Sequence, residues 1–140
     1  MFSILIKSPE KFCLPEKTIK REAEKILLKY FPESDNVELS LFFVDKDEIW
    51  QMNRRHRNLD EPASILSFSQ QEKSQTEVYQ AETGQAFVNS PDGVLRLGDL
   101  VICREIADIK NLSLKDLLNH GIAGLFSQIP TANNWRARTD

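Results

Sequence analysis

The sequence is poor in the features that mark secreted, membrane-spanning or cysteine-bound metal proteins. Its 140 residues include only two cysteines, Cys13 and Cys103, which have no CxxC neighbour and lie far apart in apolar contexts. This pattern predicts two reduced core residues rather than zinc ligands. No apolar run approaches the roughly 18 residues of a membrane span, and the apolar start is too short for a secretory signal. We therefore expect a cytoplasmic protein without membrane contact.

A basic excess is missing as well, because 18 Lys and Arg residues are set against 21 Asp and Glu residues, for a formal net charge of −3. Any RNA binding must therefore come from a local basic patch. One candidate is present, where Arg54, Arg55, His56 and Arg57 are consecutive. The remaining composition, 41% hydrophobic and 28% charged, is that of an ordinary globular protein, and the length fits one domain with its own core.

Hydrophobic periodicity predicts four strands and four helices. Alternating or continuous apolar stretches predict strands at 2–8, 37–44, 64–69 and 95–103, with Val37, Leu39, Leu41 and Phe43 on one face. Apolar residues at three-to-four intervals predict helices at 15–30, 45–57, 104–110 and 113–125. Asp45 with Glu48, and Ser113 with Asp116, have the spacing of capping residues at the start of two of these helices. The last strand ends in a continuously apolar half, which favours a central position in the sheet. The order predicts an α+β domain, in which a small mixed sheet of about four strands packs with amphipathic helices.

The chain divides into one domain and two irregular segments. We expect the domain to span 1–126 and to contain a long polar loop at 69–96, with a weak hairpin around VYQ and AFV. Loops of this length are usually functional or disordered. Pro130 and the stretch TANNWRARTD show no periodicity, so 127–140 is expected to be an irregular tail. The longer stretch AGLFSQIPTANNWRARTD, which starts near the end of the predicted helix 113–125, lacks a clear helix or strand pattern.

Three arginines end the predicted helix 45–57, in the stretch NRRHRNLDEP. Cations are favoured at a helix C-terminus, so a solvated basic face explains them. The planar guanidinium is also well suited to phosphate, so RNA binding stays open. The stretches ILSFS and LGDLVIC join strands to Ser67 and to Gly98-Asp99. These residues either let a sheet edge take an extended substrate or make a turn.

A single histidine, His120, interrupts the apolar run LLNHGIAGLF. A helical histidine becomes a metal site when a second ligand follows four residues later, because positions i and i+4 share one face. That position holds Gly124, which has no side chain. On this evidence alone, a hydrogen-bonded core histidine is favoured over a metal ligand.

The order of these stretches resembles the YbeY family of single-strand-specific metalloendoribonucleases, which mature ribosomal RNA in bacteria. That family has an asparagine and an arginine before D-x-P-T-[DN]-V-L-S-F-P, then L-G-D-[IL]-x-I, then H-G-x-L-H-L-x-G-x-D-H. The first two blocks are matched here by Asn53, Arg57, Asp60, Pro62, Leu66, Ser67 and Phe68 and by Leu97, Gly98, Asp99 and Ile102. The resemblance covers roughly residues 1–122.

The third block departs from the family pattern. His120 and Gly121 match the first zinc-binding histidine and its glycine, but Gly124 and Pro130 occupy the positions of the other two histidines. Zinc lowers the pKa of its bound water to about 7, so loss of the metal removes the generator of the nucleophile. Asp99 and Asp140 are oxygen donors, but nothing in the sequence positions them beside His120.

The resemblance implies zinc as a cofactor, and ribosomal RNA and the small ribosomal subunit as partners. It implies Arg57 as the catalytic residue that holds a phosphate and stabilises developing charge, and His120 as the surviving zinc ligand. Arg54, Arg55, Arg57 and Ser67 are the predicted RNA-binding residues.

Several hypotheses follow from the incomplete third block. The chain is a zinc-dependent endoribonuclease by descent whose catalytic competence is in question, or a non-catalytic RNA- or ribosome-binding paralogue with the same fold. Alternatively, a frameshift near codon 123 has replaced the family's C-terminal sequence with one read in another frame. An unrelated α+β domain with chance motif matches is the remaining alternative.

Overall fold

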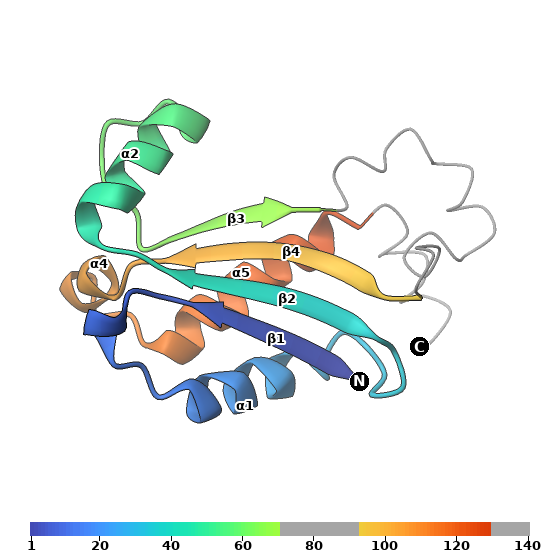
Figure 1. Cartoon of the computed structure of the whole chain (residues 1–140). Helices are drawn as coiled ribbons and strands as arrows, with labels where there is room; N and C mark the ends of the chain where they lie inside the picture. Colours follow the sequence, from blue (N-terminus) through green and yellow to red (C-terminus); the bar gives the residue numbers. More distant parts are fainter. Residues whose placement is uncertain (71–92, 130–140) are drawn as a thin grey trace.

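Four strands form a mixed β-sheet in the computed structural model, which describes residues 1–70 and 93–129 (Figure 1). Strands β1, β2 and β4 are parallel, whereas β3 runs antiparallel to β4 and forms one edge. The predicted α+β class is confirmed, as is the internal position of β4. In spatial order the strands are β1 (Phe2–Lys7), β2 (Val37–Phe43), β4 (Leu95–Ile102) and β3 (Ile65–Ser69).

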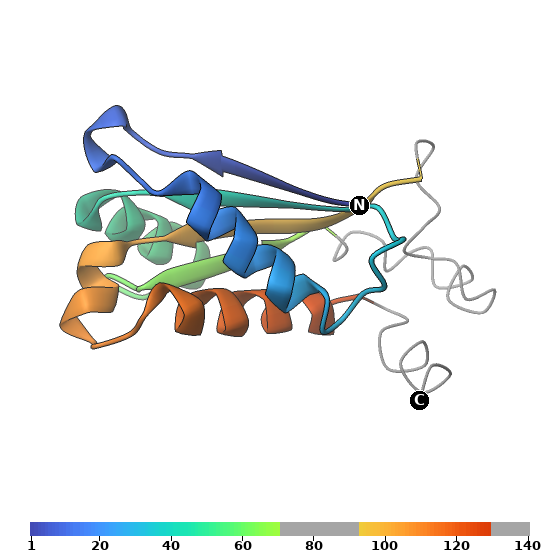
Figure 2. The same ribbon diagram turned by 90° about the horizontal axis from the view of Figure 1, so that it is seen from below.

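The helices occupy both faces of this sheet. Helices α1 and α5 lie along the same face, as Figure 2 shows from below, and α2 packs on the opposite face. None of the helices in the described residues has the length and apolar character that crossing a bilayer requires. The described helices are η1 (a 3₁₀ turn, Glu10–Phe12), α1 (Glu16–Leu27), α2 (Lys46–Arg57), α4 (Arg104–Ile109) and α5 (Leu114–Ser127).

Alternation along the strands separates two cores. In β2, every second residue is buried toward α1 and α5, as the sequence predicted for Val37, Leu39, Leu41 and Phe43. Residues of the other parity join Ile49 of α2 in a smaller core; examples are Val101 of β4 and Leu66 of β3. At the β3 edge, one face of the sheet therefore meets the core with α5, and the other face meets the smaller core with α2.

Side-chain caps begin α2 and α5 where the sequence predicted them. Asp45 Oδ1 accepts a hydrogen bond from the Glu48 N–H at 2.9 Å. At α5, Ser113 Oγ accepts from the Asp116 N–H at 3.1 Å, and Asp116 Oδ2 accepts in return from the Ser113 N–H at 3.1 Å. These bonds satisfy amide groups that have no partner within the first helical turn, so they fix where each helix starts.

The two cysteines do not share an environment. Cys103 is buried, as predicted, but Cys13 is exposed, so its predicted core position is wrong. Cys13 directly follows the short η1 turn and has a φ of 47°, the left-handed conformation of a turn residue. An apolar sequence context was therefore not enough to place it in the core.

Helix α5 continues beyond the point where the sequence lost its periodicity. The helix ends at Ser127, and both Leu125 and Ile129 are buried. The Phe126 ring packs against Tyr30 with a centroid distance of 4.8 Å. The expectation that the stretch from residue 123 lacks helical character is therefore wrong for 123–127. The predicted hairpin around VYQ and AFV lies outside the described residues, as do residues 130–140.

Candidate functional site

One cavity of about 320 Å³ lies where α2, β3 and α5 meet. Arg57, the last residue of α2, and His120 of α5 both line it. The structure therefore brings together the two residues that the sequence nominated as catalytic residue and metal ligand. We call this cavity the Arg57–His120 cleft. Its other lining residues are Ala63, Ser64, Ile65, Lys110, Leu112, Asp116 and Leu117.

Arg57 is positioned by the turn that ends α2. Asn58 has a φ of 57°, and its N–H donates to the carbonyl of Arg54 at 3.1 Å. Asn53 is 1% exposed, and its Nδ2 donates to the carbonyl of Glu61 at 2.7 Å. This bond ties the loop that follows the helix back to the helix itself. The asparagine of the sequence motif is therefore a structural residue that fixes the chain beside Arg57.

Gly121 explains how α5 can lie close to β3. A Cβ at this position would lie 2.8 Å from Ile65 Cδ1 and 2.8 Å from Leu100 Cδ1, closer than packed carbon atoms approach. His120 precedes this glycine, is exposed and lines the cleft. The interpretation of His120 as a buried core residue is therefore wrong, because the buried face of α5 is carried by its neighbours.

The cleft contains two cations, Arg57 and Lys110, that have no carboxylate partner among the described residues. Neither Arg57 nor Lys110 forms an ion pair with another of the described residues. Asp116 lines the same cleft, but hydrogen bonds to the backbone and side chain of Ser113 engage its carboxylate and lower its pKa. Arg57 and Lys110 are therefore available to bind an anion.

Sequence reasoning missed Lys110 and Ser64 as cleft residues. Lys110 follows α4, and Asn111 after it has a φ of 61°. Such a pair marks a helix end, but it does not reveal which distant helix the lysine will face. Ser64 is buried and immediately precedes β3. Only the tertiary fold places these residues beside Arg57.

The side chains around His120 do not fit the zinc site that the resemblance implies. Gly124, one helical turn after His120, offers no ligand atom. In the part of the chain that the structure describes, no group of three or more His, Cys, Asp and Glu side chains could hold a metal ion. The described residues therefore lack the donor set that a zinc-activated water requires.

Asp99, which the sequence offered as a substitute ligand, lies on the other face of the sheet. Its neighbour Leu100 faces Gly121 of α5, and adjacent residues of a strand point to opposite faces. Asp99 instead lines a groove with Phe68 and His56, and its burial there raises its pKa. Asp140, the other substitute, and Pro130 lie outside the described residues.

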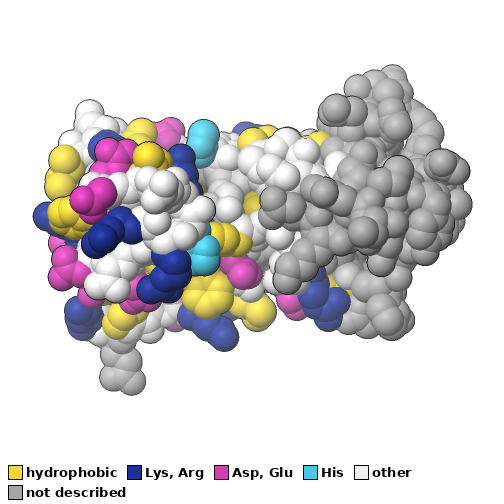
Figure 3. Space-filling view, turned by 90° about the horizontal axis from the view of Figure 1, so that it is seen from above, with side chains coloured by type: hydrophobic (Ala, Val, Ile, Leu, Met, Phe, Trp, Pro, Cys, Tyr) yellow, Lys and Arg dark blue, Asp and Glu magenta, His cyan; other side chains and the backbone are white. Residues whose placement is uncertain are grey.

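That groove has a volume of about 410 Å³ and is separate from the Arg57–His120 cleft. His56 and Phe68 meet edge to face within it, with ring centroids 5.2 Å apart. Viewed from above, Figure 3 shows two separate histidine patches on the surface. The two histidines of the chain therefore serve different surfaces.

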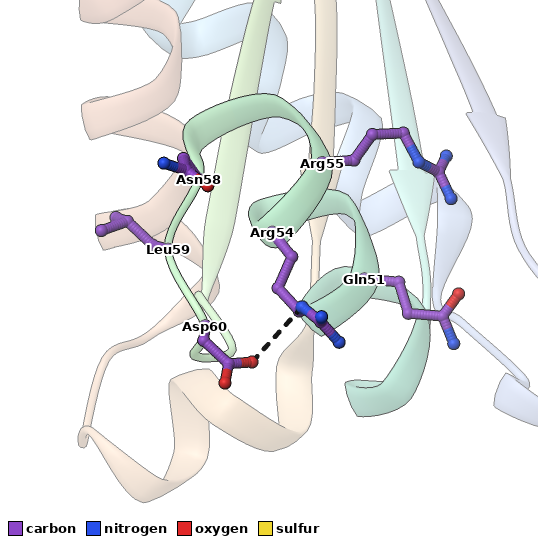
Figure 4. A pocket seen from close by; sticks show the side chains of 6 residues that line it. All are labelled: Gln51, Arg54, Arg55, Asn58, Leu59 and Asp60. Atoms are coloured by element: carbon purple, nitrogen blue, oxygen red, sulfur yellow. Dashed lines mark ion pairs between the residues drawn. The ribbon is translucent and has the colours of Figure 1, made fainter.

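Arg54 and Arg55 line a third surface, an open cavity of about 600 Å³ on the outer side of α2 (Figure 4). Arg54 Nε lies 3.5 Å from Asp60 Oδ1, and the same oxygen accepts a hydrogen bond from Trp50 Nε1 at 2.9 Å. Arg55 points away from Asp60 in Figure 4. The three predicted RNA-binding arginines are therefore not brought together, and only Arg57 reaches the cleft.

Ser67 lies near the cleft but does not line it. It is exposed on β3, where it pairs with Leu100 of β4. Side chains two residues apart in a strand share a face, so Ser67 continues the face on which Ile65 lines the cleft. An extended ligand in the cleft would reach Ser67 by following this edge strand.

Comparison with known proteins places this arrangement in a family. The family model described as Endoribonuclease YbeY matches residues 5–126. The chain belongs to the YbeY family. The Endoribonuclease YbeY of Dehalococcoides mccartyi is 28% identical over 123 residues, which cover 88% of this chain and 69% of that protein. The Endoribonuclease YbeY of a Thermoanaerobacter species is 37% identical over 98 residues, which cover 67% of this chain and 54% of that protein.

A solved structure also resembles this YbeY-family chain. The solution structure of TM1509 from Thermotoga maritima has a TM-score of 0.47 and 19% sequence identity, and the match covers 96% of this chain and 93% of that one. The matches to the two Endoribonuclease YbeY proteins cover smaller shares of those proteins, 69% for Dehalococcoides and 54% for Thermoanaerobacter.

Within the YbeY-family motifs, structural residues are distinct from cleft residues. Leu97 and Ile102 are fully buried. Gly98 has a φ of 149°, and a Cβ there would lie 2.5 Å from the carbonyl oxygen of Phe68, so glycine allows β3 and β4 to approach. Of the motif residues that this chain keeps, Arg57 and His120 line the cleft itself.

Proposed function

We propose that this chain acts on single-stranded RNA in ribosomal RNA maturation, as an endoribonuclease of the YbeY family. The observation that supports this proposal is the Arg57–His120 cleft, in which the arginine and the histidine of two separate family motifs line one cavity. We further propose that it works in the cytoplasm on RNA of the small ribosomal subunit. The endoribonuclease activity follows the names of the relatives, whereas the single-stranded ribosomal RNA and the cytoplasm are what the family resemblance implies.

Arg57 supplies the chemistry that an RNA backbone requires. A guanidinium presents several N–H donors in one plane and can bind two oxygens of a phosphate. Because its charge is fixed, it also stabilises negative charge that develops on a phosphate during cleavage. Arg57 has no ion-pair partner among the described residues that would compete with the phosphate.

The edge strand β3 gives the RNA a path beyond the cleft. We propose that the hydroxyl of Ser67 contacts the sugar or phosphate of a neighbouring nucleotide, since it lies exposed on the same strand face as Ile65. An unpaired strand can follow such an edge with its bases turned outward, whereas a duplex holds its backbones at a fixed spacing. This arrangement supports a preference for single-stranded RNA.

A second candidate function is RNA or ribosome binding without cleavage. The observation that favours it is Gly124, which offers His120 no second ligand one turn further along α5. A chain that lacks the zinc donor set but keeps Arg57 would retain phosphate binding and lose the metal-generated nucleophile.

The two candidates are separated by a cleavage assay on matched RNAs, run together with elemental analysis of zinc in the purified protein. Single-stranded and duplex RNA of the same sequence serve as substrates, and Arg57→Ala and Arg54→Ala serve as variants. Cleavage of the single strand that Arg57→Ala abolishes and Arg54→Ala preserves supports the endoribonuclease. Binding without cleavage supports the second candidate, and absence of both contradicts the proposed function.

A further inference from the structure

The α5 wall of the cleft has an open position where a metal ligand would be needed. A Cβ at Gly124 would meet nothing within 4 Å, so the space one turn after His120 is not filled by a neighbouring described side chain. The same wall nevertheless carries a positive charge, because Lys110 lines the cleft beside Asp116 and His120. This positive charge belongs to Lys110 in the turn before α5, and no residue of the helix itself supplies it to the cleft.

That turn holds Lys110 firmly. The Lys110 N–H donates to the Ile106 carbonyl at 3.0 Å, and the Leu112 N–H donates to the Ala107 carbonyl at 2.8 Å. Asn111 between them takes the left-handed conformation, with a φ of 61°. Because these hydrogen bonds fix the backbone at Lys110 and just after it, the Cα of Lys110 has a defined position beside the cleft.

Lys110 and Arg57 face one cavity from different walls. Arg57 comes from the end of α2, and Lys110 comes from the turn between α4 and α5. Among the described residues that line this cleft, the one carboxylate is that of Asp116, which is held in the cap of α5. Two cations that line one cavity of about 320 Å³ offer N–H donors to the two non-bridging oxygens of an RNA phosphate, which share its negative charge.

We propose that the cleft binds an RNA phosphate between Arg57 and Lys110 without a metal ion. This inference rests on the proposed function, since it assumes that the ligand of the cleft is RNA. It assigns to Lys110 the positive charge that the incomplete zinc site does not supply. RNA binding by this chain is then independent of zinc, whether or not cleavage follows.

The test measures the affinity of the full chain for a short fluorescein-labelled single-stranded RNA by fluorescence anisotropy. Titrations are run in EDTA and then with added zinc, and the salt concentration is varied. Lys110→Ala is compared with Lys115→Ala, which removes an exposed lysine of α5 that does not line the cleft. Lys110→Arg preserves the charge, and thermal unfolding of each variant verifies that the fold is intact.

We expect the same affinity in EDTA and in zinc. Lys110→Ala weakens binding by about tenfold, as for loss of one charge-assisted contact, whereas Lys115→Ala changes it by less than about twofold. Lys110→Arg binds as the unmodified chain does. Lys110→Ala also reduces the slope of log affinity against log salt by about 0.7, which is the value for one phosphate contact on a single strand.

Three results would overturn the inference. RNA binding that EDTA abolishes and zinc restores shows that a metal is required. Equal effects of Lys110→Ala and Lys115→Ala show that Lys110 has no specific contact. Loss of binding in Arg57→Ala but not in Lys110→Ala rejects the role of Lys110 while leaving the proposed function intact. A chain that binds no RNA in any condition refutes the proposed function itself.

Discussion

The two walls of the Arg57–His120 cleft have kept different parts of the family pattern. The α2 wall keeps Asn53 and Arg57 of its motif, although Ala63 and Ser64 replace the usual Thr and Asp or Asn, and the Asn53 bond to Glu61 fixes the loop beside Arg57. The α5 wall keeps His120 and Gly121 but has Gly124 where a second imidazole would complete a ligand pair. The shape of the cleft and the metal donor set are therefore separable, because Gly121 still allows α5 to approach β3 although Gly124 removes the second ligand of the helix.

The largest effect is expected from filling the space at Gly121. Gly121→Val would force two branches into a position where a Cβ alone already lies 2.8 Å from Ile65 Cδ1. We expect a loss of about 2–4 kcal/mol of unfolding free energy, because α5 must move away from β3. Chemical denaturation measures this loss.

Gly124→Ala is the matched control for that variant. It lies on the same helix with nothing within 4 Å of its Cβ, so alanine should stabilise the helix by up to about 1 kcal/mol. Equal destabilisation by the two substitutions would contradict the assignment of Gly121 as the packing contact of the α5 wall.

The next largest effect concerns two arginines on one helix, Arg57 and Arg54. Arg57 has no ion-pair partner among the described residues, whereas Arg54 lies 3.5 Å from Asp60 on another surface. We expect Arg57→Ala to weaken the binding of single-stranded RNA at least about tenfold, and Arg54→Ala to weaken it less than about twofold. Filter binding at fixed salt measures both. A larger loss for Arg54→Ala would move the RNA site to the outer side of α2.

A smaller gain is expected from returning one ligand to the α5 wall. Gly124→His places an imidazole four residues after His120, on the same helix face, at a position where a Cβ would meet nothing within 4 Å. Isothermal titration should show tighter binding of zinc than in Gly124→Ala. Zinc binding of equal strength in the unmodified chain would show that its metal site is complete by other means.

The smallest effect is the pH dependence that Asp116 contributes. Hydrogen bonds to Ser113 lower the pKa of Asp116 in the folded chain. The Asp116 carboxylate therefore stabilises the fold at pH values above the pKa of an unfolded aspartate, and this contribution is lost as the pH falls through the lower pKa of the folded chain. Asp116→Asn should therefore be less stable than the unmodified chain near neutral pH. The stability difference should shrink on acidification, as followed by thermal unfolding. A constant difference across this pH range would contradict the role of the cap.

Local patterns in the sequence predicted much of this fold. Alternation predicted which residues of β2 are buried, and the Ser113–Asp116 spacing predicted the start of α5. Local patterns did not reveal that Lys110 faces Arg57, because that depends on how the α4–α5 turn meets the end of α2. Local patterns also favoured a buried His120, because the sequence shows that the helix is apolar. The sequence does not show which side of the helix borders a cleft.

The site residues divide in the same way. Arg57 and His120 could be nominated from the resemblance, and the structure places both in one cleft. Arg54 and Arg55 were nominated because they are adjacent to Arg57, but successive helical residues point in different directions, and Arg54 is engaged by Asp60. Their predicted role in RNA binding stays a prediction, as does that of Ser67.

The most direct test of the account is to locate the RNA on the molecule. In a nuclear magnetic resonance titration with short single-stranded RNA, we expect amide shifts to concentrate around Arg57, at 63–65, at 110–112 and near His120. Shifts that instead concentrate around Gln51, Arg54 and Asp60 would place the RNA on the outer side of α2 and contradict the assignment of the Arg57–His120 cleft.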